Sequence, residues 1–189
     1  MIYRRALWAR LFFLILRCPH VLYFIGRAIV GDMTGVELKR LPARVIPFSA
    51  FKARYPEGRV LVALNPNARR YGENPYVKYD SARSPFLYRG RYKGPGQPLS
   101  YVVSVGKDAW LLDDLRQAHV ITYGDLRLSW QKGMNSALDT QRVDSGRDIG
   151  FIRVQKKTVS GYEDVPYDTT FAFAFKAFHP DGTIHKKSY

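Results

Sequence analysis

The sequence carries one ten-residue pattern twice, FKARYPEGRV at 51–60 and FKAFHPDGTI at 175–184. The copies lie 124 residues apart; five positions are identical and two more are conservative exchanges. Each copy has an aromatic, alanine-containing stretch of helix length, then a proline that disfavours helix at the preceding residue, an acid and a glycine suited to a tight turn, and β-branched residues. The repeat predicts a unit of helix, turn and strand that occurs twice.

The second copy is ambiguous when it is taken alone. Phe171, Phe173 and Phe175 alternate as they would in a strand. The first copy, in contrast, is preceded by Pro47, and proline is favoured in the first turn of a helix. Because the copies correspond, we predict a short helix over 170–178, capped by Asp168 or Thr169.

The rest of the chain is dominated by strand patterns. The predicted strands cover 59–64, 101–105, 119–122, 126–130 and 151–159, and a second helix, capped by Asp108, is predicted over 107–118. The proline-containing stretch 65–100 predicts long loops and irregular chain. The expected fold class is α+β with strands dominant, in which short helices pack on a mostly antiparallel sheet.

The composition indicates a globular protein and leaves the partner open. A chain of 189 residues with 46% hydrophobic residues suits one domain, or one compact body of two related halves. Its net charge of +14 favours anionic neighbours such as nucleic acid, lipid headgroups or acidic polysaccharide. The single Cys18 can form no internal disulfide and supplies no cysteine pair for structural zinc.

The N-terminal segment 1–24 contains four arginines and no acid around a short apolar run at 11–16. This run is too short for a signal peptide, and the charged and proline residues that follow disfavour a full membrane span. A surface-lying anchor, a degenerate signal, a poorly packed extension and a mis-started translation product stay open. The compartment, cell envelope, membrane surface or cytoplasm, is therefore open too.

Several motifs together resemble an uncharacterised prokaryotic family, the domain of unknown function 3179 family. They are GRAIVG at 26–31 with Gly35 and Leu38, YPEGRVL at 55–61, RYGENPYVKYD at 70–80 and FAFKAFHP at 173–180. The resemblance extends from about Ile25 to the C-terminus, and the tyrosine-containing block is its most specific part. It implies no reaction, because the family has no established activity.

The resemblance also implies a division of the chain. Full members of the family carry a Cys-Pro-Leu-Cys motif upstream, and nothing like it precedes Ile25. We therefore expect an extension at 1–24, the end of a first repeat at 25–61, and a second repeat at 62–189 that packs as one body. The segment 133–139 stands where a cysteine-bearing turn would lie, and it has no cysteine.

The stretch 69–93 interleaves basic and aromatic residues, a pattern that single-stranded nucleic-acid binders use. The same pattern arises where half-buried tyrosines pack among basic side chains whose aliphatic stems are buried. Because no recognised nucleic-acid motif accompanies the pattern, we favour a packing role for these tyrosines. His179 corresponds to Tyr55 in the first copy, and a tyrosine cannot act as a ligand or base in the same way. We therefore favour a packing role for His179 too. The candidate ligand-binding residues are Arg70, Tyr71, Tyr76, Lys78, Tyr79, Asp80 and His179.

Three functional hypotheses follow. The first is a non-catalytic binding or scaffold protein that holds an anionic ligand or partner on a tyrosine- and arginine-rich surface. The second is a fragment of an enzyme or of a metal or redox protein whose site needs the upstream Cys-Pro-Leu-Cys half. The third is a single-stranded nucleic-acid binder. The sequence identifies no catalytic residue, metal ligand or cofactor, and an exposed apolar face would favour self-association.

Overall fold

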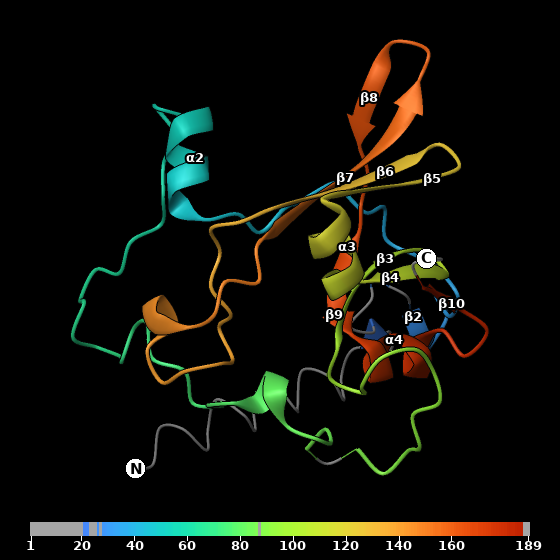
Figure 1. Ribbon diagram of the computed structural model, residues 1–189, viewed down its shortest axis with the longest axis horizontal. Coiled ribbons are helices and arrows are strands. Elements are labelled where there is room, and N and C mark those ends of the chain that lie inside the picture. Colours follow the sequence, from blue (N-terminus) through green and yellow to red (C-terminus); the bar gives the residue numbers. More distant parts are fainter. Residues whose placement is uncertain (1–20, 23–25, 27, 87, 187–189) are drawn as a thin grey trace. The chain divides into compact units, whose positions relative to one another are not determined.

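The computed structural model describes residues 21–22, 26, 28–86 and 88–186 (Figure 1). The chain divides into two compact units, Met1–Leu41 and Pro42–Tyr189. In the first unit, β1 (Val21–Leu22) pairs with β2 (Ala28–Val30) in antiparallel orientation. Apart from Val21–Leu22, the predicted extension at 1–24 lies outside the described residues.

The second unit contains two four-stranded sheets. The first has the order β10-β4-β3-β9 and comprises β3 (Tyr101–Val105), β4 (Asp108–Leu111), β9 (Asp168–Phe171) and β10 (Thr183–His185). The second has the order β5-β6-β7-β8 and comprises β5 (Val120–Tyr123), β6 (Leu126–Gln131), β7 (Phe151–Thr158) and β8 (Gly161–Asp164). Within these sheets the pairing of β10 with β4 is parallel and the other pairings are antiparallel. The predicted α+β class with mostly antiparallel strands is confirmed.

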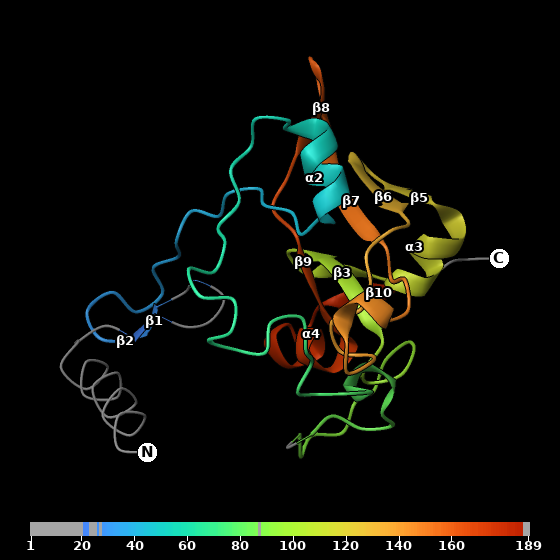
Figure 2. The ribbon, with the colours of Figure 1, turned by 90° about the vertical axis from the view of Figure 1, so that its left-hand side faces the viewer.

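Three α-helices lie among the described residues: α2 (Phe48–Arg54), α3 (Leu112–Ala118) and α4 (Ala172–Phe178). Helix α3 follows β4 directly and leads into β5, so it connects the two sheets (Figure 1 and Figure 2). Two short 3-10 turns, Tyr79–Ser81 and Val143–Ser145, lie in the long connections.

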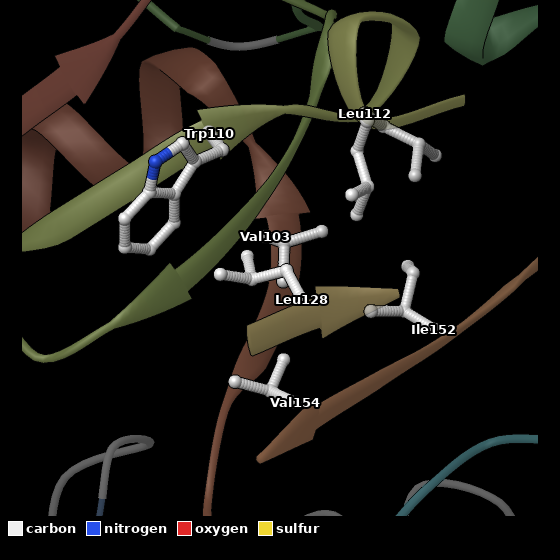
Figure 3. Packing of buried hydrophobic residues seen from close by; sticks show 7 residues of the cluster. Val103, Trp110, Leu112, Leu128, Ile152 and Val154 are labelled. Atoms are coloured by element: carbon white, nitrogen blue, oxygen red, sulfur yellow. The ribbon is translucent and has the colours of Figure 1, made fainter. Parts of the chain in front are cut away.

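The main hydrophobic core lies between the two sheets and α3 (Figure 3). Its buried members are Val103, Trp110, Leu112, Leu115, Leu128, Ile152 and Val154. Alternate residues of a strand point to opposite faces of its sheet. Val102 and Ala109, which neighbour Val103 and Trp110 in sequence, therefore enter a second cluster on the other face of the first sheet, together with Ala172, Phe175 and Ile184.

The predicted helix over 107–118 is wrong over its first five residues. Asp108 lies in β4 rather than at a helix cap, and the helix begins at Leu112. Ala109 and Trp110 fill two different clusters, which requires the alternation of a strand. The two-residue connection Gly106-Lys107, with φ of +59° at Gly106, joins β3 to β4 as a tight hairpin.

The predicted helix over 170–178 is confirmed only from Ala172 onward. Asp168 and Thr169, the predicted caps, belong to β9, which pairs with β3. The alternation of the phenylalanines is thus a real strand signal up to Phe171, where the strand ends and α4 begins.

The predicted strand at 59–64 is also wrong, because these residues form no strand in the structure. Leu61 and Leu64 are fully exposed. A strand needs a neighbouring strand to accept its backbone hydrogen bonds. In the second copy of the repeat, β10 follows α4 and pairs with β4. The strands predicted at 101–105, 119–122, 126–130 and 151–159 are confirmed within one or two residues at each end.

Candidate functional site

The second sheet carries a hollow of about 460 Å³ that is lined by four arginines. We call this feature the arginine hollow. Its arginines are Arg44, Arg54, Arg127 and Arg153, and its other polar lining residues are His119, Ser129, Gln131 and Gln155. None of the described residues that line it is acidic.

The alternation of β6 and β7 places the polar lining residues on one face of the sheet. Leu128 and Val154 pair across the two strands and point into the main core. The flanking pairs, Arg127 with Gln155 and Ser129 with Arg153, therefore point to the opposite face, where the hollow lies. Helix α2 contributes Ala50 and Arg54, which are one helical turn apart.

One carboxylate compensates part of this charge. Arg153 Nε donates to Asp164 Oδ1 at 2.7 Å, and Arg44 lies 3.8 Å from Asp164 Oδ2. Arg54 and Arg127 instead stack over tyrosine rings, those of Tyr55 at 5.7 Å and Tyr162 at 5.4 Å. In the described part of the chain these two guanidiniums have no acidic partner, so their planar donors are available to an anion.

A different polar cluster surrounds Asp80, one of the sequence-predicted residues. The Asp80 side chain is fully buried and forms a two-pronged ion pair with Arg147, with nitrogen–oxygen distances of 3.0 and 2.8 Å. Ser136 Oγ donates to the same carboxylate at 2.5 Å, and the Tyr101 hydroxyl lies at 3.4 Å. Asp139 Oδ1 lies 3.4 Å from Nη1 of Arg147. We call these five residues the Asp80 cluster.

The Asp80 cluster has the properties of a structural junction. It joins the tyrosine-containing block to the loop 133–147 through side chains, while the backbone N–H of Lys78 donates to Asp139 O at 2.7 Å. Ser136, which lies in the segment where the resemblance implied a cysteine-bearing turn, is fully buried. A hydroxyl without access to solvent is poorly placed to attack a substrate.

Burial of tyrosines in this unit gives the stability a dependence on alkaline pH. Burial raises the pKa of Tyr101 above its ordinary value of 10.0, and the Asp80 carboxylate adds to the increase. Burial also raises the pKa of Tyr92 and Tyr167. A pKa that is higher in the folded than in the unfolded state stabilises the fold below pH 10, and this contribution is lost as the pH rises through the folded pKa.

We therefore expect the free energy of unfolding to fall as the pH rises above 10, and to fall less steeply in Tyr101→Phe. Urea unfolding measured at a series of pH values from neutral to 11.5 checks this. Tyr76→Phe, at an exposed position, is the control and should keep the wild-type slope. Equal slopes in Tyr101→Phe and wild type would contradict the assignment.

The structure does not bring the predicted site residues together around one ligand site. Arg70 is largely exposed and pairs with Glu73 at 3.6 Å, and Tyr71 is exposed. Tyr76, Lys78 and Tyr79 line a mainly apolar hollow of about 690 Å³ together with Val77, Ala82, Phe86 and Leu138.

The packing role of His179, which its correspondence with Tyr55 favours, stays a prediction. His179 is the C-cap residue of α4, and its ring lies 5.2 Å from that of Phe175.

The residues of the arginine hollow are not identified as a site by the sequence analysis. The alternation of Arg127, Ser129 and Gln131 with apolar residues is a signal for a polar sheet face. No sequence signal places Arg44 and Arg54, which precede the sheet by about 70 residues or more, over that face. In the described ranges no group of three or more His, Cys, Asp or Glu side chains is arranged to hold a metal ion, and no described helix has the length and apolarity of a membrane span.

Comparison with known proteins places the chain in a family. Neither the search of curated proteins nor the search of solved structures gave a match. The model of the family described as protein of unknown function, DUF3179, matches residues 23–182. This match covers most of the chain, and it includes the tyrosine-containing block, both helices of the repeat, the whole second sheet and the first sheet except β10. The chain therefore belongs to the DUF3179 family.

Proposed function

We propose that this protein is a non-catalytic binding protein for a small polyanion, which it holds in the arginine hollow. The observation that supports the proposal is the lining itself: four arginines meet at one hollow, and no acid is among its described lining residues. Asp164 compensates Arg44 and Arg153 from the side, which leaves the hollow with an excess of positive charge.

The chemistry of the lining favours phosphate or carboxylate groups. Arginine presents a rigid fork of N–H donors that matches the oxygens of both groups in a bidentate arrangement. His119, Ser129, Gln131 and Gln155 add hydrogen-bonding groups that can orient a ligand. A volume of about 460 Å³ is in the range of small-molecule sites.

The ligand is anionic, as the sequence analysis expects, but its site is the arginine hollow and not the tyrosine- and arginine-rich surface. The candidates Arg70 and Tyr71 are solvent-exposed, and Arg70 has an acidic partner. An exposed arginine that is already paired with an acid binds an anionic ligand weakly, because solvent and salt screen its charge. The hollow offers arginines from a helix, a loop and two strands that converge on one space.

Inorganic pyrophosphate is a suitable probe for this site. We expect saturable binding by isothermal titration calorimetry at low salt, and a weakening of about tenfold or more in Arg127→Gln, because a hydrogen bond to a charged group contributes about 1.5–3 kcal/mol. Arg127 is exposed on its strand, so the exchange should leave the fold intact.

Arg70→Gln is the matched control, since it removes the same charge from the surface that the sequence favoured. We expect its affinity for pyrophosphate to stay within about twofold of wild type. Equal weakening in both variants would indicate a general effect of net charge and would contradict the site. Binding of a single-stranded oligonucleotide that Arg127→Gln leaves unchanged, without binding of pyrophosphate, would favour a nucleic-acid surface instead.

A further inference from the structure

The two copies of the helix–turn pattern have the same backbone geometry. Helices α2 and α4 are both seven residues long, and their bounds differ by the same 124 residues as the sequence repeat. Their C-cap residues, Tyr55 and His179, have φ, ψ of −130°, 76° and −126°, 75°. In both turns the cap N–H donates into the helix at 2.8 Å, and the glycine three residues later donates to the cap carbonyl at 2.9 Å.

The packing inside the two turns also corresponds. A Cβ added at Gly58 would lie 2.6 Å from Cζ of Phe51, and one added at Gly182 would lie 2.8 Å from Cζ of Phe175. In each copy the phenylalanine ring therefore lies directly over the glycine. This contact gives a physical reason for two of the five identical positions of the repeat.

In the second copy a β-hairpin covers the apolar face of this unit. Ala172, Phe175 and Ile184 are buried against Val102 of β3 and Ala109 of β4. The strand after the turn, β10, pairs in parallel with β4, with Thr183 beside Asp108 and Ile184 beside Ala109. The N–H of Thr183 donates to Lys107 O at 2.8 Å.

In the first copy the corresponding face is open to solvent. Phe48, at the position of Ala172, is 64% exposed, and Val60, at the position of Ile184, is 51% exposed. The next residues, Leu61, Val62 and Leu64, are largely or fully exposed as well. Along the helix, Phe48 and Phe51 lie on a different face from Ala50 and Arg54, so the arginine hollow does not use this surface.

We propose that α2 and residues 55–61 form a docking surface for a β-hairpin of a separate partner chain. The hairpin binds as β3 and β4 bind the second copy: its edge strand pairs in parallel with residues 59–61, and its apolar face covers Phe48, Phe51 and Val60. We call this surface the hairpin-docking surface. The proposal does not depend on the proposed function.

The residues of the docking surface specify the partner's chemistry. Phe48 stands where the second copy has the small Ala172, so the partner hairpin must present a smaller residue to this site than Val102 in order to fit. Arg59 stands where Thr183 lies beside Asp108, and Lys52 adds a second positive charge, against the one negative charge of Glu57. An acidic residue at the turn end of the hairpin is therefore complementary.

The test uses the full chain and two cyclised peptides that reproduce residues 99–112, with Val103 and Trp110 replaced by threonine for solubility. One peptide keeps Val102 and the other carries Val102→Ala. We expect saturable binding by fluorescence anisotropy, tighter for the Val102→Ala peptide. Val60→Asp in the protein should weaken binding at least about tenfold, because burial on docking would leave its charge unpaired.

Leu64→Asp is the matched control, because Leu64 is also solvent-exposed but lies beyond the three residues whose counterparts form β10. It should bind as wild type does, and unchanged thermal unfolding should show that both variants are folded. Failure of both peptides to bind wild-type protein, or equal binding to Val60→Asp, would overturn the proposal. A homodimer in sedimentation analysis that Val60→Asp dissociates would also overturn it, because the occupant would be a second copy.

Discussion

Replacement of Phe175 by alanine is expected to lower the free energy of unfolding by about 3–5 kcal/mol. Phe175 is 1% exposed, and it packs in the cluster that joins α4 to the first sheet through Val102, Ala109 and Ile184. Its ring also lies over Gly182 in the turn. The truncation would leave a cavity beneath the helix and would loosen the turn that positions β10. Urea unfolding followed by circular dichroism measures the change.

The repeat supplies the control for this prediction, because Phe51 has the same place in the first copy. Phe51 lies over Gly58 but is only partly buried. We expect Phe51→Ala to cost about 1 kcal/mol, as for a partly exposed side chain. Equal losses in Phe51→Ala and Phe175→Ala would contradict the conclusion that a hairpin covers only the second copy.

Replacement of Arg147 by alanine is expected to lower the free energy of unfolding by about 2–3 kcal/mol. Removal of one partner of a buried ion pair costs about 3–5 kcal/mol, since the remaining charge is left uncompensated. Arg147 is 41% exposed, so solvent reduces this loss, but the Asp80 side chain that it would leave behind is fully buried.

Arg142→Ala is the matched control for Arg147→Ala. Arg142 pairs with Asp144 on the same loop, and both side chains are mostly exposed. An exposed ion pair contributes little, so we expect the free energy of unfolding of Arg142→Ala to stay close to that of wild type. In the double variant Asp80→Asn, Arg147→Ala the loss should be smaller than the sum of the two single losses, because no buried charge remains. Additive losses would show that the pair is not coupled.

The sequence predicts the strands of this fold better than it predicts the ends of the helices. Alternation over 101–105, 126–130 and 151–159 is enough to identify β3, β6 and β7, because each has one face in the main core. The stretch 107–118 fails because Trp110, Leu111 and Leu112 suit a helix as well as a strand. The structure resolves this through the two clusters that Ala109 and Trp110 fill, which are tertiary features.

The candidate site was less predictable for a related reason. Asp80 could be found from the sequence because it ends the most specific block of the family resemblance. Its partners Ser136 and Arg147 lie 56 and 67 residues further along the chain. The arginine hollow likewise joins residues from the segment 44–54 to two strands of the second sheet. Sequence spacing carries no information about such long-range contacts.

The measurement that tests the central claim most directly is an NMR titration of the arginine side chains with pyrophosphate. The Nε–Hε signals of Arg54 and Arg127, assigned from the Arg54→Gln and Arg127→Gln variants, report on the hollow separately from the basic stretch 69–93. We predict that both signals shift together and saturate at one affinity, while those of Arg83, Arg89 and Arg91 stay unchanged. Shifts confined to these last three arginines would contradict the account and would place anion binding on the tyrosine- and arginine-rich stretch.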